Sequence, residues 1–317
     1  MNHSINVLIV TYRQENVIGR TIDSILQQKE FGLNEIVICD DCSPDNNWEV
    51  IKSYQARFPN IIRAYRNENN LGIYGNSNKL VSLRGNSELY YWLEGDDALC
   101  DGAFKSIQEY IERESIELSN ACGFFLDWKT IRPDGQELIS SNRAVTVNKS
   151  PFSLYIRNIV SWRGAFFTAA VINQFSPVDV NNGLNLAEGL FDSQWFRYVK
   201  HLYHIDALGA IYYSGIGIST EISDLDSDYN TLDAIGKWQY FRDHFANNWR
   251  DKMWLNSRIK RIECVMQPSW GLFFKSVFYY ILGVYYNKRC FKKGDFVKFV
   301  YPIYKSTKKM FRGANNS

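Results

Sequence analysis

The chain has 317 residues, of which 45% are hydrophobic and 22% are charged, and its formal net charge is +2. This composition excludes an intrinsically disordered chain, and the length is sufficient for one large domain or two smaller ones. The charge is unevenly distributed, because nine Lys or Arg and one acid fall in residues 288–312, which leaves a net charge of −6 for the rest. A basic segment of this kind favours contact with an anionic surface.

The N-terminal residues lead straight into a strand pattern and lack the basic and apolar regions of a secretory signal. The sequence therefore predicts a cytoplasmic protein with reduced thiols, held peripherally on the inner face of the cell membrane. Cys39 and Cys42 form a C-x-x-C pattern, but two acids lie between them and no second pair stands at the spacing of a zinc site. We interpret both as incidental thiols.

Strands alternate with helices over the first part of the chain. Apolar runs predict strands at 6–11, 35–40, 61–66 and 89–93, with helical spacing between and after them. This alternation predicts βαβ units in a Rossmann-like, mostly parallel α/β sheet flanked by helices. Right-handed crossovers place the carboxyl ends of such strands along one edge, where open α/β sheets bind their ligands.

An acidic motif directly follows the fourth predicted strand. Glu94, Asp96 and Asp97 stand close together around Gly95, and carboxylates packed this tightly repel one another unless a cation lies between them. Oxygen ligands of this type suit a hard divalent cation, Mg²⁺ or Mn²⁺. A solvated turn is the alternative, because Gly-Asp and Asp-Asp are ordinary turn sequences.

The second half of the chain has less regular patterns. Expected elements are a strand at 121–126, a hairpin within 127–148 turning at 133–135, a helix at 152–159, a strand at 162–167, a loop at 181–189, a helix at 191–201, a strand at 204–214 and a mobile connection at 221–233. We expect a first domain over 1–217, with a nucleotide-binding half at 1–120 and an acceptor-binding half at 121–217. Residues 218–317 form a helical, aromatic and basic C-terminal extension.

The segment 268–286 is apolar and aromatic, but Lys275 interrupts it and tyrosines are frequent. A membrane span needs about 20 consecutive apolar residues with few charges. An interfacial helix followed by the basic segment fits better, so the sequence predicts binding to an anionic membrane surface through the C-terminal tail and no binding to nucleic acid.

Four short motifs occur in a characteristic order. They are Val10-Thr11-Tyr12 with Glu15, Ile-Cys-Asp-Asp-Cys-Ser-Pro-Asp over 38–45, Asn-Asn-Leu-Gly over 69–72 with Asn78, and Leu-Glu-Gly-Asp-Asp over 93–97. Together they resemble glycosyltransferase family 2, the inverting enzymes of the GT-A fold, and in particular its bacterial surface-polysaccharide type. The sequence departs from the family pattern with Glu94 in place of Asp, Cys42 in place of Gly and Arg13 in place of Asn.

The resemblance implies a set of site residues. Those expected to bind the nucleotide-sugar are Thr11, Tyr12, Glu15, Asp40, Asp41, Gly72, Asn78 and Asp96. In this set Asp41 contacts the base and Asp96 lies near the ribose, while Asp97, with Asp96 and Glu94, holds Mn²⁺ or Mg²⁺ on the diphosphate. The implied donor is a nucleotide-sugar, a UDP-sugar first of all, and the implied acceptor is a glycan or a polyprenyl-linked glycan.

The family also has a catalytic carboxylate that opens a helix in the second half of the domain. Asp192 matches this position best, and Glu188 competes with it. A plain helix N-cap is the alternative role for Asp192, because Asp is favoured there. The family's later basic element, often Tyr-Arg-x-His, has no match at 212–215, which leaves one diphosphate contact unassigned.

The sequence as a whole predicts a metal-dependent glycosyltransferase that works with inversion in the biosynthesis of O-antigen, capsule or exopolysaccharide. A nucleotidyltransferase also uses a parallel sheet and an acidic metal site, but the segment 10–15 lacks the Gly-rich, basic phosphate loop expected after its first strand. A catalytically inactive scaffold of the same fold is a further alternative. It would predict the loss of the metal or base carboxylate, and the sequence retains both.

Overall fold

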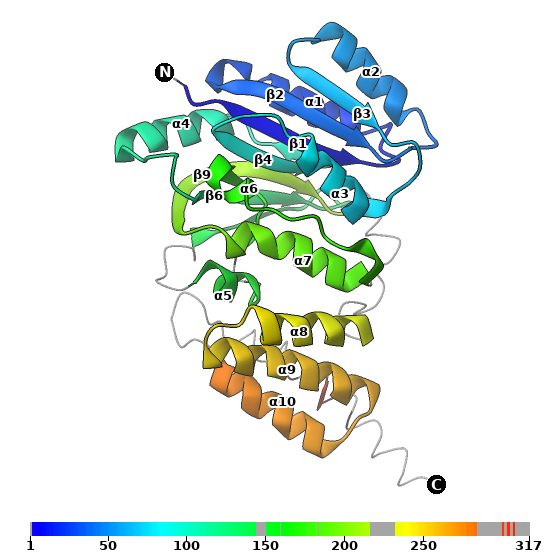
Figure 1. Ribbon diagram of the computed structural model, residues 1–317, viewed down its shortest axis with the longest axis vertical. Coiled ribbons are helices and arrows are strands. Elements are labelled where there is room, and N and C mark those ends of the chain that lie inside the picture. Colours follow the sequence, from blue (N-terminus) through cyan, green and yellow to red (C-terminus); the bar gives the residue numbers. More distant parts are fainter. Residues whose placement is uncertain are drawn as a thin grey trace. The chain divides into compact units, whose positions relative to one another are not determined.

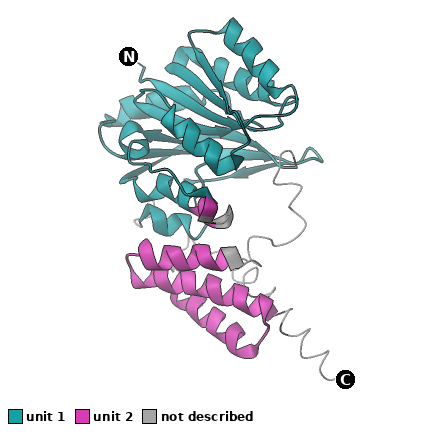
Figure 2. Cartoon of the chain, turned by 45° about the vertical axis from the view of Figure 1, so that its right-hand side comes forward, with its two compact units in different colours: residues 1–180, 190–221 teal, residues 181–189, 222–317 magenta. Residues whose placement is uncertain are grey.

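A computed structural model describes residues 2–143, 150–158, 160–182, 184–215 and 232–283, together with positions 300, 303, 304 and 307. The chain divides into two compact units, shown in different colours in Figure 2. The first unit contains residues 1–180 and 190–221, and the second contains residues 181–189 and 222–317.

The first unit is built on a sheet whose first four strands are parallel. They are β1 (Ile5–Thr11), β2 (Leu33–Asp40), β3 (Ile62–Arg66) and β4 (Leu89–Glu94), in the spatial order β3-β2-β1-β4. Every residue of β1 is buried, as its continuous apolar sequence requires of a strand covered on both faces. The predicted parallel α/β sheet is confirmed for this half of the fold.

Helices cover both faces of this sheet (Figure 1). On one face α1 (Ile18–Leu26), α2 (Asn47–Arg57) and α4 (Ala103–Glu114) pack on the strands through a core of aliphatic and aromatic side chains. On the other face α3 (Gly72–Ser82) contacts β1 and β2. The part of α7 (Leu184–Arg197) that belongs to the first unit packs its Phe191 and Trp195 rings against Trp92 of β4.

The second half of the sheet is mixed. It continues from β4 in the order β8 (Ala165–Thr168), β6 (Cys122–Ile131), β9 (His201–Tyr213) and β5 (Ala98–Leu99), while β7 (Glu137–Ser140) pairs with β6. Strand β9 runs parallel to β6, and β8 is antiparallel to β4 and β6. Because the short β5 pairs with β9, the end of β9 lies beside the acidic motif. Shorter helical elements are η1 (Lys29–Phe31), α5 (Pro151–Tyr155), α6 (Ala169–Ile172) and η3 (Val180–Asn182).

Two predictions for this half have clear outcomes. The hairpin turn at 133–135 is confirmed by the β6–β7 pairing, although residues 144–149 of the predicted hairpin lie outside the described residues. The predicted loop at 181–189 is wrong, because α7 already begins at Leu184. Gly189 signalled a loop, but it lies inside the helix, where a side chain would collide with Lys237 and Phe241. Close helix packing, rather than a turn, explains the glycine there.

The second unit contains α8 (Leu232–His244), α9 (Trp249–Met266) and α10 (Trp270–Gly283), so the predicted helical C-terminal region is confirmed. Asn248 caps α9 by accepting a hydrogen bond from the amide of Asp251 at 2.9 Å. Most of the predicted connection at 221–233 lies outside the described residues, and α8 begins within it. Within the described ranges, none of the helices combines the length and the apolar character that a membrane crossing requires.

Candidate functional site

The carboxyl ends of β1, β2 and β4 lie next to one another. Thr11 is in register with Asp40, and Val10 is in register with Glu94. Beyond the strands, the amide of Asp41 donates to the Thr11 carbonyl at 3.0 Å, and that of Gly95 donates to the Val10 carbonyl at 3.0 Å. The structure therefore brings the predicted Thr11, Asp40–Asp41 and Glu94–Asp97 segments together at one edge of the sheet.

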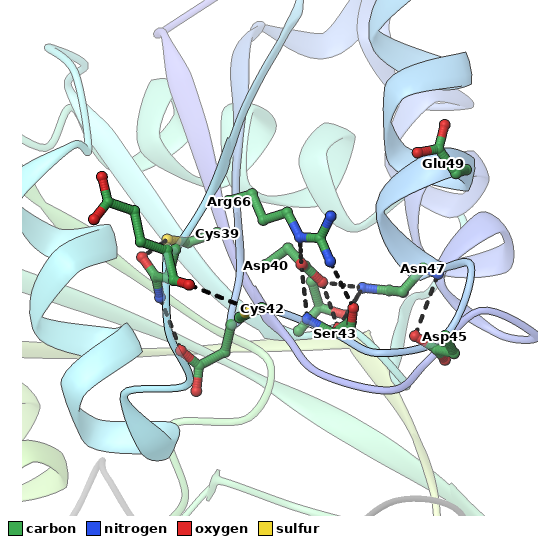
Figure 3. A network of polar contacts seen from close by, with 12 residues as sticks. Cys39, Asp40, Cys42, Ser43, Asp45, Asn47, Glu49 and Arg66 are labelled. Carbon is green, nitrogen blue, oxygen red and sulfur yellow. Dashed lines mark hydrogen bonds and ion pairs between the residues drawn. The ribbon is translucent and has the colours of Figure 1, made fainter.

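Asp40 is completely buried and holds the loop that follows β2 (Figure 3). Its carboxylate accepts hydrogen bonds from the amide and the hydroxyl of Ser43 and from the side chain of Asn47, the last at 2.7 Å. The Arg66 guanidinium lies 3.4 Å away and balances its charge. Because these partners occupy its carboxylate, Asp40 stabilises the loop conformation, and its neighbour Asp41 is the better candidate to bind a ligand.

The loops after β1 and β2 are bound to each other. The Asn46 amide donates to the Glu15 carboxylate at 2.7 Å, and the Glu15 amide donates to the Asp45 carboxylate at 3.2 Å. Thr11 donates its hydroxyl proton to Gln14 at 2.7 Å, while Tyr12 stays partly exposed. Glu15 and Thr11 therefore stabilise the loop conformation, while the partly exposed Tyr12 remains accessible to a ligand.

Two residues of these loops have left-handed backbone conformations. Arg13 and Cys42 both have φ of 58°, a region that costs an ordinary L-residue roughly 1–2 kcal/mol and that Gly and Asn tolerate better. These are two of the positions at which the sequence departs from the family pattern of Asn and Gly. The backbone conformation explains why that pattern favours those two residue types.

Replacing Cys42 by Gly is therefore expected to raise the free energy of unfolding by about 0.5–1 kcal/mol, because relief of the left-handed strain outweighs the greater entropy of the unfolded glycine chain. Urea unfolding followed by circular dichroism measures the change. Cys42→Ala is the matched control, since it removes the thiol but keeps a Cβ. Equal stability of the Gly and Ala variants would contradict the strain at this position.

Asp41 is almost fully buried, and it binds the loop that leads into α3. Its Oδ1 accepts from the side-chain amide of Asn67 and from the backbone amide of Leu71, both at 2.8 Å. Both bonds use the same oxygen, so Oδ2 retains its capacity to accept a hydrogen bond from a ligand. Leu71 itself is 46% exposed beside this carboxylate, which supplies an apolar surface next to a polar acceptor.

The remaining predicted nucleotide-site residues have mainly structural contacts. Gly72 has φ of +73° and opens α3, with its amide bound to the side chain of Asn70 at 2.9 Å. Asn78 exchanges two hydrogen bonds with the backbone of Val178, at 2.7 and 3.0 Å. Asn78 thus ties α3 to the segment after α6 and is not grouped with Asp41 at the strand ends.

The acidic motif is held in place by its backbone. A Cβ at Gly95 would collide with the side chain of Gln14 and lie 2.9 Å from that of Thr11, so glycine allows the motif to pack closely on the loop after β1. The Thr21 hydroxyl lies 2.8 Å from the Gly95 carbonyl and 2.6 Å from the Asp97 carbonyl, and it donates to either. The Arg20 guanidinium donates to the Asp96 carbonyl and stacks on the ring of Tyr213 at 3.6 Å.

Burial and mutual repulsion make two of these carboxyl groups reluctant to ionise. Burial, followed by the charge of Glu94, raises the pKa of Asp97 to about 8 and the pKa of Asp96 to about 6. The amide of Tyr213, at the end of β9, donates to Asp97 Oδ1 at 3.2 Å and opposes the shift. A site with this charge distribution favours an additional cation.

Arg163 is the residue of this site that the sequence interpretation missed. Its Nη2 lies 3.5 Å from Glu94 Oε2, its Nε lies 3.8 Å from Asp97 Oδ2, and its guanidinium covers the Tyr212 ring at 4.3 Å. No motif marked it, because it precedes β8 and reaches the acids only through the antiparallel pairing of β8 with β4. Burial lowers the pKa of Arg163, but the charges of Glu94 and Asp97 outweigh it and raise the pKa overall, so Arg163 stays charged.

The carboxylates fit a metal ion that is shared with a phosphate ligand. Across the described part of the chain, no three His, Cys, Asp or Glu side chains are grouped to hold a metal on their own. Magnesium-type sites typically use one or two carboxylates and complete their coordination with substrate phosphates and water. Asp97, with Asp96 or Glu94 beside it, satisfies that requirement.

Asp192 lies in the interior of α7 and not at its start, so the expectation that it opens a helix is wrong. A role as N-cap is excluded for the same reason. Packing of Phe191 against Trp92 places Asp192 near the end of β4, and its carboxylate contributes to the electrostatic environment of Arg163. Glu188 lies one turn earlier in the same helix.

Comparisons with known proteins show which proteins the chain resembles. Residues 6–161 match the model of glycosyl transferase family 2. Chondroitin synthase of Pasteurella multocida is 27% identical over 237 residues, which cover 70% of this chain and 22% of that protein. The chain spans about a third of the length of the first curated relatives that it matches.

Solved structures show the same fold. The structure of Staphylococcus aureus TarS with UDP-GlcNAc matches 94% of this chain and 81% of that one, with a TM-score of 0.58 and 14% identity. The structure of GalNAc-T7 with UDP, GalNAc and Mn²⁺ matches 82% of this chain and 51% of that one, with a TM-score of 0.52 and 13% identity. Residues 6–161 thus carry the match to glycosyltransferase family 2, and the chain has the GT-A fold of these solved structures.

Proposed function

We propose that this protein transfers a sugar from a UDP-sugar to a hydroxyl group of a glycan or polyprenyl-linked glycan, with inversion and with a divalent cation, in the assembly of a bacterial surface polysaccharide. The observation that carries the proposal is the position of Asp41 and Asp97 at one edge of the sheet, beyond the ends of β2 and β4 on either side of β1, in the part of the chain that matches family 2. One carboxylate is suited to a base and the other to a metal-bound diphosphate.

Each residue has a role that follows from its contacts. Asp41 Oδ2 accepts a hydrogen bond from the base, and the exposed Leu71 covers the base from one side. Asp97, assisted by Asp96 and Glu94, holds the divalent cation. When bound, this cation acts as a Lewis acid toward the departing nucleoside diphosphate. Residues 1–120 would hold the nucleotide, and residues 121–217 the acceptor.

Asp192 is the proposed general base. It accepts the proton of the acceptor hydroxyl as the oxygen attacks the anomeric carbon from the face opposite the leaving diphosphate. Its position in α7 is fixed by the packing of Phe191 and Trp195 on β4, so the carboxylate is held on a rigid element and within electrostatic reach of Arg163. Attack from that side inverts the anomeric centre.

A donor screen tests the proposed function. The purified protein is incubated with single nucleotide-sugars and Mn²⁺, and the released nucleoside diphosphate is measured with and without EDTA. UDP-GlcNAc comes first, because TarS, a poly(ribitol-phosphate) β-N-acetylglucosaminyltransferase, matches this chain in sequence and was solved with that donor. Release from a UDP-sugar that EDTA abolishes is the expected result. Release from none of the common nucleotide-sugars would contradict the proposal.

A membrane-binding role for the second unit is also part of the proposed function. One face of α10 is buried against α9 through Ser276, Tyr280 and Gly283. Its other face carries a row of exposed apolar side chains at helical spacing, namely Trp270, Phe274, Phe278 and Ile281. The basic segment 288–312 follows this helix in the sequence. An exposed apolar row followed in the sequence by a cluster of positive charge suits an anionic membrane surface.

Removing two members of this row is expected to weaken membrane binding. Phe274 and Phe278 are 64% and 58% exposed, so replacing both by Ser leaves the fold intact but removes about 1.5–3 kcal/mol of burial for each ring that enters the lipid. Flotation with vesicles containing phosphatidylglycerol should show at least a ~10-fold loss of binding. High salt should weaken the binding of the parent.

Trp249→Ser is the matched control for this experiment, because Trp249 is 56% exposed on α9, outside the row. Deleting the chain from residue 288 onward is a poorer test of membrane binding than the double Ser variant. Ile303 and Thr307 are fully buried, and Thr307 contacts Cys264 at 3.5 Å, so the truncated protein would lose part of its core. Unchanged flotation of the double Ser variant would contradict a role for α10 at the membrane.

A further inference from the structure

Across the described part of the chain, the charged guanidinium of Arg163 makes no hydrogen bond. Its two contacts with carboxylates, at 3.5 and 3.8 Å, are too long to be hydrogen bonds. Its Nε is buried and has no hydrogen-bond partner within the described residues. A guanidinium presents a rigid fork of donors, and a buried donor without an acceptor is costly. This fork is therefore arranged for an acceptor that the described residues do not supply.

The backbone around Arg163 is fixed before any ligand binds. The side chain of Asn142, fully buried, donates to the Arg163 carbonyl at 3.1 Å and to the Leu126 carbonyl at 2.9 Å, and it accepts from the Ser161 amide at 2.9 Å. Gly164 follows with φ of +71°, and a Cβ there would lie 2.9 Å from the Leu126 carbonyl. The loop is thus held closely on β6.

The side chain of Arg163 is also supported along its length. Its guanidinium covers the Tyr212 ring at 4.3 Å and lies 5.2 Å from the ring of Trp162. The end of the side chain is therefore held over the acidic motif without hydrogen bonds that would have to be broken. Arginine in such a position binds phosphate oxygens through two parallel N–H bonds.

The charges of the site point to the same ligand. Glu94, Asp96 and Asp97 repel a diphosphate, and one divalent cation offsets only part of that repulsion. Arg20 lies nearby, but its guanidinium already donates to the Asp96 carbonyl and stacks on Tyr213. The Nε of Arg20 also lacks a partner, but among the described residues it is the guanidinium of Arg163 that faces these carboxylates without making a hydrogen bond.

We propose that Arg163 binds a phosphate oxygen of the donor's diphosphate and so supplies the basic contact for which the segment 212–215 has no matching residue. This assignment rests on the proposed function. A phosphate held by a divalent cation at Asp97 would be within reach of Arg163, since the guanidinium is 3.8 Å from that carboxylate. The phosphate would take the place of the two long carboxylate contacts.

Calorimetry with UDP and with uridine, both in the presence of Mn²⁺, tests the assignment. Arg163→Gln is expected to bind UDP at least ~10-fold more weakly than the parent, because it loses a charge-assisted bidentate contact. Uridine, which has no phosphate, should bind equally to both proteins. Arg163→Lys should recover part of the affinity for UDP, since it keeps the charge but not the fork.

Arg84→Gln is the matched control, because Arg84 belongs to the same unit and its guanidinium is bound to Asn173 and to the Val81 carbonyl, away from the strand ends. It should bind both ligands as the parent does. Undiminished UDP affinity in Arg163→Gln, or an equal loss for UDP and uridine, would overturn the assignment. Failure of the parent to bind any of UDP, GDP, ADP, CDP and TDP would instead contradict the proposed function, and the arginine contact with it.

Discussion

Replacement of Asp192 by Asn is expected to lower the rate of sugar transfer by about 10²–10⁴-fold, the usual contribution of a general base, and to leave donor affinity unchanged. The substitution preserves the size of the side chain and its ability to hydrogen-bond. Asp192 is inside α7, so no helix cap is lost. What disappears is the capacity to accept a proton from the acceptor hydroxyl. Transfer is measured with a sugar acceptor, and donor affinity is measured separately by calorimetry.

Glu188→Gln is the internal control, because Glu188 lies one turn earlier in the same helix. Near-normal transfer in Glu188→Gln combined with loss in Asp192→Asn is the expected pair of results. The opposite pair would move the role of base to Glu188 and keep the mechanism. Near-full activity of both variants would show that α7 carries no base.

Replacement of Asp97 by Asn is expected to reduce transfer by at least ~10²-fold, since Lewis-acid stabilisation by a metal is worth several kcal/mol. A neutral amide is a poorer ligand for a hard cation, so Mn²⁺ should no longer strengthen nucleotide binding in this variant. Calorimetry of UDP with and without Mn²⁺ provides the readout. Asp101→Asn, at an exposed acid that follows the motif, is the control and should behave as the parent.

Although Asp97→Asn should lower activity, it should raise the stability of the fold at high pH. The pKa of Asp97 is raised to about 8 in the folded protein, mainly by burial. Because the folded state holds this proton more tightly than the unfolded state, the contribution of Asp97 to stability is fully present below the ordinary pKa of Asp. It is lost as the pH rises through about 8. The Asn side chain stays neutral, so the free energy of unfolding of Asp97→Asn should rise relative to the parent between pH 5 and pH 9. Urea unfolding in EDTA measures it, and a constant difference would contradict the raised pKa.

The positions of Asp41 and Asp97 could be predicted from the sequence because each follows an apolar run that can only be a buried strand. Parallel strands joined by helices place their carboxyl ends together, and β1, β2 and β4 do so. The internal role of Asp40 was not predictable, since its partners Ser43, Asn47 and Arg66 depend on the exact loop conformation.

Arg163 and the end of β9 lay beyond sequence reasoning for a different reason. Arg163 reaches the acids through antiparallel pairing, and Tyr213 reaches Asp97 through a strand, β5, of only two residues. Neither pairing has a periodic sequence signal. The start of α7 was missed because Gly189 serves helix packing inside a helix, where local propensity indicates a break.

A crystal structure of the protein with UDP and Mn²⁺ is the decisive test of the proposed nucleotide and metal site, because it locates both ligands relative to named side chains. We expect the metal to bind Asp97 and the diphosphate, and the base to accept or donate hydrogen bonds beside Asp41. Nucleotide bound away from the carboxyl ends of β1, β2 and β4, or a metal that contacts none of Glu94, Asp96 and Asp97, would contradict this account.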